Sequence, residues 1–311
     1  MRAGYLLAAI LVSICGWLFW PRSGAFTVDE TLYAFQDGFL EMSSQGVIHY
    51  VDEGEGPVIL LLHGNPTWSF LYRKMIPGLA EEHRVIAPDY PGFGLSKARA
   101  GFGFTAVEQA AVMDEFLSRM DLREVTLFVQ DWGGPIGLFL AERNPDRIQR
   151  LVIGNTWAWP IERDSQRRFS QIMGGPVGKF IAWCCNGIVR LFFARGVVTP
   201  LSQEELRMYL APFETRASRT PTHVFPAELT AASSFLEGVL DDLPRIADKP
   251  TLLVWGQKDF AFQAPERERF EAIFRDHPTV LLEEAGHFIQ EDAPEEIVQA
   301  ITDWEAELAS R

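Results

Sequence analysis

The sequence predicts an α/β protein in which helices cover both faces of a mostly parallel sheet. Short aliphatic, β-branched runs alternate with amphipathic stretches between residues 47 and 155, and the same alternation returns after residue 250. This pattern is typical of parallel strands joined by helical crossovers. Between residues 156 and 243 the strand-like runs stop, and the sequence is helical, aromatic and interrupted by prolines. The simplest interpretation is one sheet with a helical insertion.

Six apolar runs are predicted to be buried strands, because each is short, rich in Val, Ile or Leu and bounded by polar or turn residues. They are Val58–Leu62, Val85–Pro88, Val125–Val129, Ile148–Ile153, Thr251–Trp255 and Thr279–Leu282. Two stretches have helical spacing, Ala106–Met120 and the final segment from about Ala293 to Leu308.

The order of these elements predicts two domains. Residues 26–155 and 244–311 form the core domain, and residues 156–243 form a helical cap inserted after a strand. Open α/β sheets bind ligands beyond the carboxyl ends of their strands. We therefore expect the cap to cover the ligand site.

Composition excludes several classes of function. The 311 residues include 42 acidic and 28 basic side chains, and the net charge of −14 disfavours binding to nucleic acid or to anionic lipid. The three cysteines, Cys15, Cys184 and Cys185, form neither a disulfide framework nor a cysteine-based metal site. We expect the last two to be small buried hydrophobes.

Residues 1–25 are predicted to be a signal peptide or a membrane anchor. The run Tyr5–Trp20 is uncharged and sixteen residues long. A spanning helix needs about 20 residues and the apolar part of a secretory signal about 7 to 15, so length does not decide between them. Ser23–Ala25 fits a cleavage site, whereas the proline and arginine before it fit an anchor attached through residues 5–20. In either case Arg2 lies on the cytoplasmic side and the body outside. A start codon assigned too early, which would make the protein cytoplasmic, is the third reading.

The strongest chemical signal follows the third predicted strand. Gln130–Pro135 joins this strand to an apolar helix, which is the strand–turn–helix context of a nucleophile elbow. Asp131 occupies the place of the usual serine, and two consecutive glycines allow the tight turn. The residue two positions before Asp131 is valine, a departure from the usual glycine. Taken alone, an aspartate at this point is more often a helix N-cap than a nucleophile.

Three further segments favour the catalytic interpretation. The backbone of Asn65, in the loop after the first predicted strand, and that of Trp132 can form an oxyanion hole. His287 is the histidine placed late enough in the chain to act as a base. Asp259 follows the strand Thr251–Trp255 and can orient that imidazole, although an isolated aspartate there is often a turn residue. The order nucleophile, acid, histidine is that of α/β-hydrolases.

Together these segments resemble the haloalkane dehalogenases over roughly residues 26–309, and most of all the subgroup whose acid follows the penultimate strand. The resemblance is carried by His63–Trp68, Gln130–Pro135, Asn155–Trp157, Trp255–Phe262 and His287–Pro294.

The resemblance implies an α/β-hydrolase fold and a hydrolase acting on carbon–halide bonds. It makes Asp131 the nucleophile, His287 the base and Asp259 the acid, with Asn65 and Trp132 as halide-binding donors. The implied substrate is a small apolar halogenated alkane, and water and halide are the other partners; no cofactor or metal is expected. An additional halide donor could come from Trp157, Trp159 or Trp183, for each of which packing is the other reading.

Aromatic residues of the predicted cap could also line an apolar substrate pocket. The candidates are Phe169, Phe180, Trp183, Phe192 and Phe193.

Other functions remain open at this stage. Epoxide hydrolases resemble the chain but polarise their product alkoxide with two cap tyrosines, whereas Tyr209 is the only tyrosine between residues 156 and 243. Fluoroacetate dehalogenases place arginine after the nucleophile, where this chain has Trp132. A serine esterase would need serine at position 131. A non-catalytic small-molecule receptor on the same fold would keep the pocket without needing the three catalytic residues.

Overall fold

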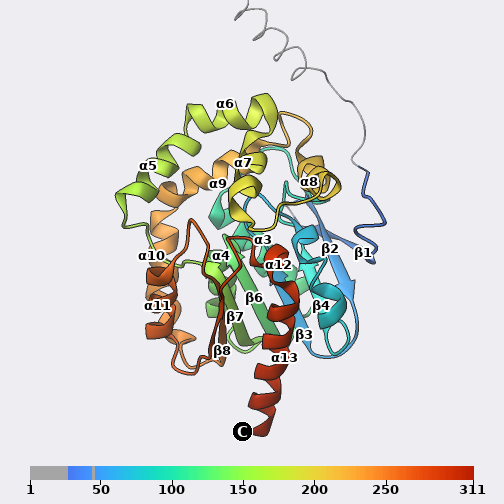
Figure 1. The fold of residues 1–311 in the computed structure, drawn as a ribbon, viewed down its shortest axis with the longest axis vertical. Coiled ribbons are helices and arrows are strands. Elements are labelled where there is room, and N and C mark those ends of the chain that lie inside the picture. The colour runs from blue at the N-terminus through green and yellow to red at the C-terminus, as the bar shows by residue number, and fades with distance from the viewer. Residues whose placement is uncertain (1–26, 44–45) are drawn as a thin grey trace, which may run out of the picture.

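The computed structural model describes residues 27–43 and 46–311, so the predicted leader lies outside the described residues. Nine strands form one sheet in the order β1-β2-β4-β3-β6-β7-β8-β9, with β5 paired to β2 (Figure 1). The strands are β1 Asp37–Met42, β2 Gly46–Glu53, β3 Val58–Leu62, β4 Arg84–Pro88, β5 Lys97–Ala98, β6 Val125–Asp131, β7 Ile148–Thr156, β8 Thr251–Gly256 and β9 Thr279–Leu282.

The sheet is parallel from β4 through β3, β6, β7 and β8 to β9, and β2 is antiparallel to β1, β4 and β5. This confirms the predicted fold class and all six predicted strands. The strands that the sequence did not reveal are β1, β2 and β5. They are short or only partly buried, and β2 carries polar residues such as His49 and Asp52 among its apolar ones. A search for continuous apolar runs mainly finds strands that are covered on both faces, as β3, β6 and β8 are.

Helices pack on both faces of the sheet and at one end of it. Those around the sheet are η1 Ser69–Tyr72, α2 Ile76–Leu79, α3 Ala106–Arg119, α4 Gly133–Arg143, α11 Ala264–Ile273, α12 Ile289–Asp292 and α13 Pro294–Ser310. Those between β7 and β8 are α5 Asp164–Met173, α6 Pro176–Cys185, α7 Gly187–Gly196, α8 Gln203–Leu210, η2 Ala211–Phe213, α9 Thr220–Ala231, α10 Ser233–Asp242 and η3 Leu243–Arg245.

The helices α5 to α9 form a layer at one end of the sheet, with α6 outermost (Figure 1). Two contacts place α9 over the carboxyl ends of β3 and β6. The side-chain amide of Asn65 donates to the carbonyl of Thr222 at 3.3 Å, and the rings of Trp132 and Phe225 lie 5.1 Å apart. Ligands of open α/β sheets bind at this end.

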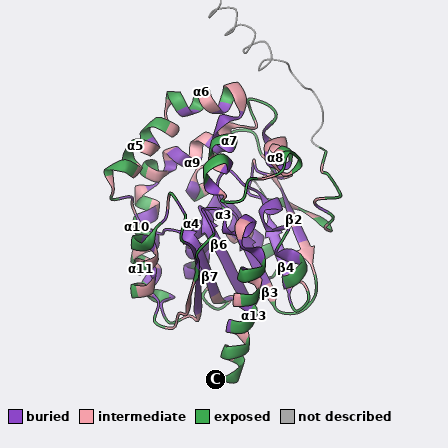
Figure 2. Cartoon of the chain, viewed as in Figure 1, coloured by how far each residue is buried: buried purple, intermediate pink, exposed green. Residues whose placement is uncertain are grey.

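Burial follows the layers. The strands β6 and β8 are buried along their whole length, whereas α5 and α6 are largely exposed on their outer sides (Figure 2). Because they lie on the outermost helix, Cys184 and Cys185 are partly exposed free thiols, so the prediction that they are buried is wrong.

Candidate active site

Asp131 is the last residue of β6 and adopts a left-handed backbone conformation, with φ of +50°. Such a conformation costs a non-glycine residue about 1–3 kcal/mol and is common at active sites. Close neighbours must be glycine: a Cβ on Gly64 would lie 2.3 Å from the Asp131 side chain, and one on Gly134 would lie 1.8 Å from the hydroxyl of Thr156. That hydroxyl donates to the carbonyl of Asp131 at 2.5 Å. The turn therefore has the geometry of a nucleophile elbow.

The valine that replaces the usual strand glycine is accommodated by a glycine on the helix. A Cβ on Gly137 of α4 would lie 2.4 Å from Cγ1 of Val129. The helix can approach the strand because Gly137 has no side chain at that point. Gly137 therefore compensates for the valine at the position where the usual motif has glycine.

Both backbone donors of the predicted oxyanion hole face the carboxylate of Asp131. The N–H of Asn65 donates to Oδ1 at 2.7 Å, and the N–H of Trp132 also hydrogen-bonds to the carboxylate. Burial raises the pKa of Asp131, and the two N–H groups and His287 oppose this shift. One oxygen of the side chain thus occupies the hole and the other remains for chemistry.

His287 lies between the carboxylates of Asp131 and Asp259. Its Nε2 is 3.6 Å from Oδ2 of Asp131, its Nδ1 is 3.0 Å from Oδ2 of Asp259, and its side chain is only 1% exposed. Burial lowers the pKa of His287. The charge of Asp259, the hydrogen bond to it and the charge of Asp131 raise this pKa by more than burial lowers it, so the pKa of His287 lies above its ordinary value. The structure thus brings the three residues of the predicted triad together.

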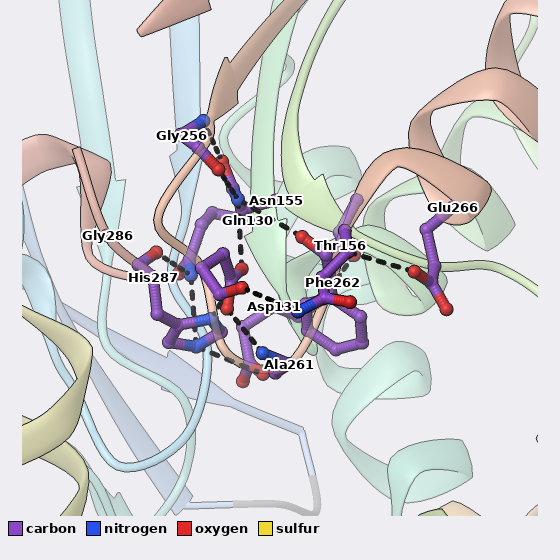
Figure 3. A network of polar contacts seen from close by, with 12 residues as sticks. Gln130, Asp131, Asn155, Thr156, Gly256, Ala261, Phe262, Glu266, Gly286 and His287 are labelled. Atoms are coloured by element: carbon purple, nitrogen blue, oxygen red, sulfur yellow. Dashed lines mark hydrogen bonds and ion pairs between the residues drawn. The ribbon is translucent and has the colours of Figure 1, made fainter. Parts of the chain in front are cut away.

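Asp259 is held by groups that sequence reasoning did not assign. The side-chain amide of Asn155 donates to its Oδ2 at 2.9 Å, and the N–H of Ala261 donates to its Oδ1 at 2.6 Å. Asn155 is in turn fixed because its Oδ1 accepts from the N–H of Gly256 at 2.7 Å. This side chain links the ends of β7 and β8 (Figure 3) and orients the acid.

Gln130 is a second unassigned residue beside the base. Its buried side-chain amide donates to the carbonyl of His287 at 3.0 Å and lies 3.3 Å from Nε2 of the same residue. A donor directed at Nε2 favours the neutral imidazole, in which Nε2 carries the lone pair. In the sequence, the only sign of this role was the position of Gln130 directly before Asp131.

The loop that carries His287 is attached to the cap by one carboxylate. Asp292, in α12, accepts from the N–H of Gly286 at 2.9 Å. The same carboxylate accepts from the N–H groups of Val198 and Thr199, after α7, at 3.0 and 3.1 Å. We refer to these four residues as the Asp292 clamp. It couples the position of the base to the seating of the cap.

A cavity of about 310 Å³ begins at Asp131 and His287 and extends between the core and the cap. Its other lining residues are Asn65, Trp132, Arg163, Ser165, Gln166, Phe169, Phe192, Pro226, Leu229, Phe260, Ala261, Phe262 and Gln263.

Two of the five aromatic candidates, Phe169 and Phe192, line this cavity. The others do not. Phe180 and Trp183 are exposed on α6, and Phe193 is stacked on Phe288 with ring centroids 4.5 Å apart.

The predicted halide donors lie at the inner end of the cavity beside Asp131. Trp132 and Asn65 both line it, and one hydrogen of the Asn65 amide is used by Thr222. Of the three additional candidates, none is among the lining residues. The buried indole N–H of Trp157 has no hydrogen-bond partner among the described residues, and its ring packs against Trp132 at 4.8 Å.

The one tyrosine of the cap region has a structural role. The hydroxyl of Tyr209 is buried against Glu291, and Nη1 of Arg73 donates to it at 3.4 Å. No tyrosine belongs to the lining of the cavity within the described residues. The pair of alkoxide-polarising tyrosines expected of an epoxide hydrolase is therefore not at this site. Nor does any group of three or more His, Cys, Asp or Glu in that part of the chain have the geometry to hold a metal ion.

Comparison with known proteins agrees with this geometry. Residues 57–294 match the family model described as alpha/beta hydrolase fold. The chain is 42% identical over 278 residues to "Haloalkane dehalogenase 2" of Mycobacterium tuberculosis, covering 89% of this chain and 97% of that protein. It is 31% identical to a "Cis-3-alkyl-4-alkyloxetan-2-one decarboxylase" of Shewanella oneidensis, covering 88% and 89%.

A solved structure gives the same result. The crystal structure of a haloalkane dehalogenase from Bradyrhizobium elkani superposes with a TM-score of 0.81 at 27% identity, covering 89% of this chain and 99% of that one. With the fold, the order of the three polar residues and the relatives in agreement, the chain belongs to the haloalkane dehalogenase family of α/β-hydrolases.

Proposed function

We propose that this protein hydrolyses small haloalkanes to alcohol and halide through an alkyl ester on Asp131. One observation carries the proposal: Oδ1 of Asp131 accepts the N–H of Asn65, while Oδ2 lies 3.6 Å from Nε2 of His287 at the inner end of an apolar cavity. A carboxylate in this arrangement can attack with one oxygen and place the other in an oxyanion hole.

In the first step Oδ2 attacks the sp³ carbon in line with the halogen. The new carbon–oxygen bond forms as the carbon–halogen bond breaks, and the halide leaves with the bonding electron pair. The indole N–H of Trp132 and the amide of Asn65 stabilise the halide. Loss of one such donor is expected to cost about 3 kcal/mol by analogy with oxyanion holes, roughly a hundredfold in rate. No proton transfer is needed.

In the second step neutral His287 takes a proton from water, and the resulting hydroxide adds to Cγ of Asp131. Oδ1 becomes the oxyanion and is held by the N–H groups of Asn65 and Trp132. Collapse breaks the bond between Cγ and the ester oxygen, and the alkoxide takes the proton from the imidazolium. The carboxylic acid left on Asp131 then releases its proton to solvent, which restores the carboxylate. Esterification has also removed the negative charge of Asp131, which helps to raise the pKa of His287. The base is therefore more readily neutral in the intermediate.

We propose that the two domains predicted from the sequence have separate roles. The core domain, residues 26–155 and 244–311, supplies the catalytic groups, and the cap, residues 156–243, supplies Phe169 and Phe192 as substrate walls. We further propose that residues 1–25 export or anchor the protein, with the catalytic domain outside the cytoplasm, because Tyr5–Trp20 is uncharged. Fractionation of cells into membrane, soluble and exported fractions tests this last point.

The function is tested by halide release from 1-bromobutane and 1,2-dibromoethane, using the full-length chain and Asp131→Ala. Multiple turnovers that the variant has lost support the proposal. Styrene oxide and a cis-3,4-dialkyloxetan-2-one serve as competing substrates, the latter because of the decarboxylase relatives. If the protein converts either compound but releases no halide, the proposed substrate class is wrong, while the assignment of Asp131 as the nucleophile stands. Binding without any turnover would indicate a receptor.

A further inference from the structure

Exposed apolar side chains are concentrated on the outer surface of the cap. Ten large hydrophobic side chains are exposed in the described part of the chain, and six of them lie between residues 172 and 198. On α6, Val177, Phe180 and Trp183 are 56%, 66% and 40% exposed. Their spacing of three residues places them on one face of the helix, while Gly178 and Ala182 are buried on the other. Figure 2 shows α6 as the outermost layer, with its exposed residues facing away from the body.

The same segment has an unusual charge. Ser165–Gln203 contains five cationic side chains and no acidic one, in a chain whose net charge is −14. All five are exposed on the surface: Arg167, which is paired with Asp164 at 3.1 Å, and Arg168, Lys179, Arg190 and Arg195. One of them extends over the apolar face, since Nζ of Lys179 lies 4.7 Å from the centroid of the Trp183 ring.

We propose that this surface docks on an anionic phospholipid bilayer. We define the cap patch as Ile172, Val177, Phe180, Trp183 and Leu191 together with the cations Arg168, Lys179, Arg190 and Arg195. An exposed face that combines aromatic and aliphatic side chains with Lys and Arg is suited to the membrane interface. Each cation close to an anionic surface strengthens binding about fivefold. Burial of one Phe side chain adds roughly a further tenfold or more.

The negative charge of the whole protein does not prevent such docking. Electrostatic interactions are screened over about 8 Å at physiological ionic strength. The groups nearest the lipid therefore dominate, and in this orientation they are cationic. The net charge of −14 describes the average surface of the protein and not the cap patch.

The proposed contact lies at the surface of the bilayer. Among the described residues, no single helix is long and apolar enough to cross a membrane; α6 and α7 reach the length and composition together but are bent by 94°. The docking does not depend on the proposed activity. If that activity holds, α5 and α7, which flank α6, also carry Phe169 and Phe192 of the cavity. Haloalkanes dissolve in lipid, so docking would bring the cavity close to its substrate.

Hydroxyl-radical footprinting of the full-length chain tests the docking whether or not residues 1–25 insert. Oxidation of Phe180 and Trp183 is measured by mass spectrometry without lipid, with phosphatidylcholine vesicles and with vesicles containing phosphatidylglycerol. We expect severalfold protection of both residues with the anionic vesicles alone, and none for Phe39, which is 58% exposed on β1. Equal oxidation in all three samples would overturn the proposal, because Phe180 and Trp183 would then not be covered by lipid, even if residues 1–25 bind the vesicles.

Two variants separate lipid from other occupants. Phe180→Ser is expected to raise the lipid concentration that gives half-maximal protection of Trp183 roughly tenfold or more, and the matched surface change Phe39→Ser to leave that concentration unchanged. Protection that is equal on both kinds of vesicle would overturn the assignment to an anionic surface. Protection without vesicles that increases with protein concentration would identify a second copy of the chain as the occupant and also overturn the proposal.

Discussion

Replacing Asp292 by alanine is expected to slow ester hydrolysis more than ester formation. The change leaves three N–H groups of the Asp292 clamp without their carboxylate. Those of Val198 and Thr199 are near solvent, so water can replace the acceptor. The main loss falls on Gly286, which precedes the base. A hydrogen bond to a charged group contributes about 1.5–3 kcal/mol, which corresponds to roughly ten- to a hundredfold in rate if it is lost as misplacement of His287.

The two chemical steps depend differently on that base. Attack by Asp131 on the haloalkane needs no proton transfer, so the first-turnover burst of halide is expected to stay within a fewfold of wild type. Hydrolysis of the ester needs His287, so the steady-state rate is expected to fall roughly ten- to a hundredfold. Rapid-quench halide measurement gives both rates, and intact-protein mass spectrometry detects the accumulated alkyl-enzyme.

Two further variants complete the experiment. Asp292→Asn keeps one acceptor oxygen and is expected to give an intermediate effect. Asp303→Ala removes an exposed carboxylate on α13 that accepts a hydrogen bond from the side chain of Gln299, and this variant is expected to behave as wild type. If burst and steady-state rates of Asp292→Ala fell by the same factor, with no alkyl-enzyme detected, the clamp would be a general support of the fold and our reasoning would be refuted.

Three other changes give independent tests. Gly64→Ala places a Cβ 2.3 Å from the Asp131 side chain, so kcat/KM should fall by roughly a hundredfold or more; wild-type activity would contradict the close approach. Hydrolysis of the ester needs neutral His287, so the raised pKa of this base predicts that kcat declines as pH falls, and pH profiles of kcat should show this limb moving to lower pH in Asp259→Asn. Burial raises the pKa of Glu142 to about 9, so the folded state keeps a proton that the unfolded state releases above about 4.5, and stability falls as pH rises between these values. Urea unfolding at pH 9 should therefore show Glu142→Gln to be more stable than wild type by about 1–3 kcal/mol, and an unchanged pH slope would contradict it.

The parts of the fold that were predicted are those whose signal is local. The central strands are continuous apolar runs because both of their faces are covered, and so Val58–Leu62 was found with its observed ends. The strand β2 was missed because its sequence, which includes His49, is only partly buried and mixes polar with apolar residues. The glycine that accommodates Val129 could not be inferred either, because the contact with Gly137 depends on how α4 packs on β6.

The candidate site divides in the same way. The three residues proposed to react were predicted because each follows a recognisable strand and their order is that of the fold. Asn155, Gln130 and Asp292 were not assigned roles. Asn155 acts on Asp259, which is 104 positions away, and Asp292 on the segment after α7, 93 to 94 positions away. An amide or carboxylate carries no sign of its partner until the chain has folded, so the sequence suggested the groups proposed to react and not those that position them.

The central claim is that the oxygen of the first alcohol comes from Asp131. It is tested most directly by a single turnover in H₂¹⁸O, with enzyme in excess over 1-bromobutane. If water attacks Cγ of the ester, the alcohol carries ¹⁶O and one ¹⁸O is found in the peptide that contains Asp131. If instead the alcohol carries ¹⁸O after one turnover and this peptide is unlabelled, water has attacked the substrate directly and the covalent mechanism is wrong.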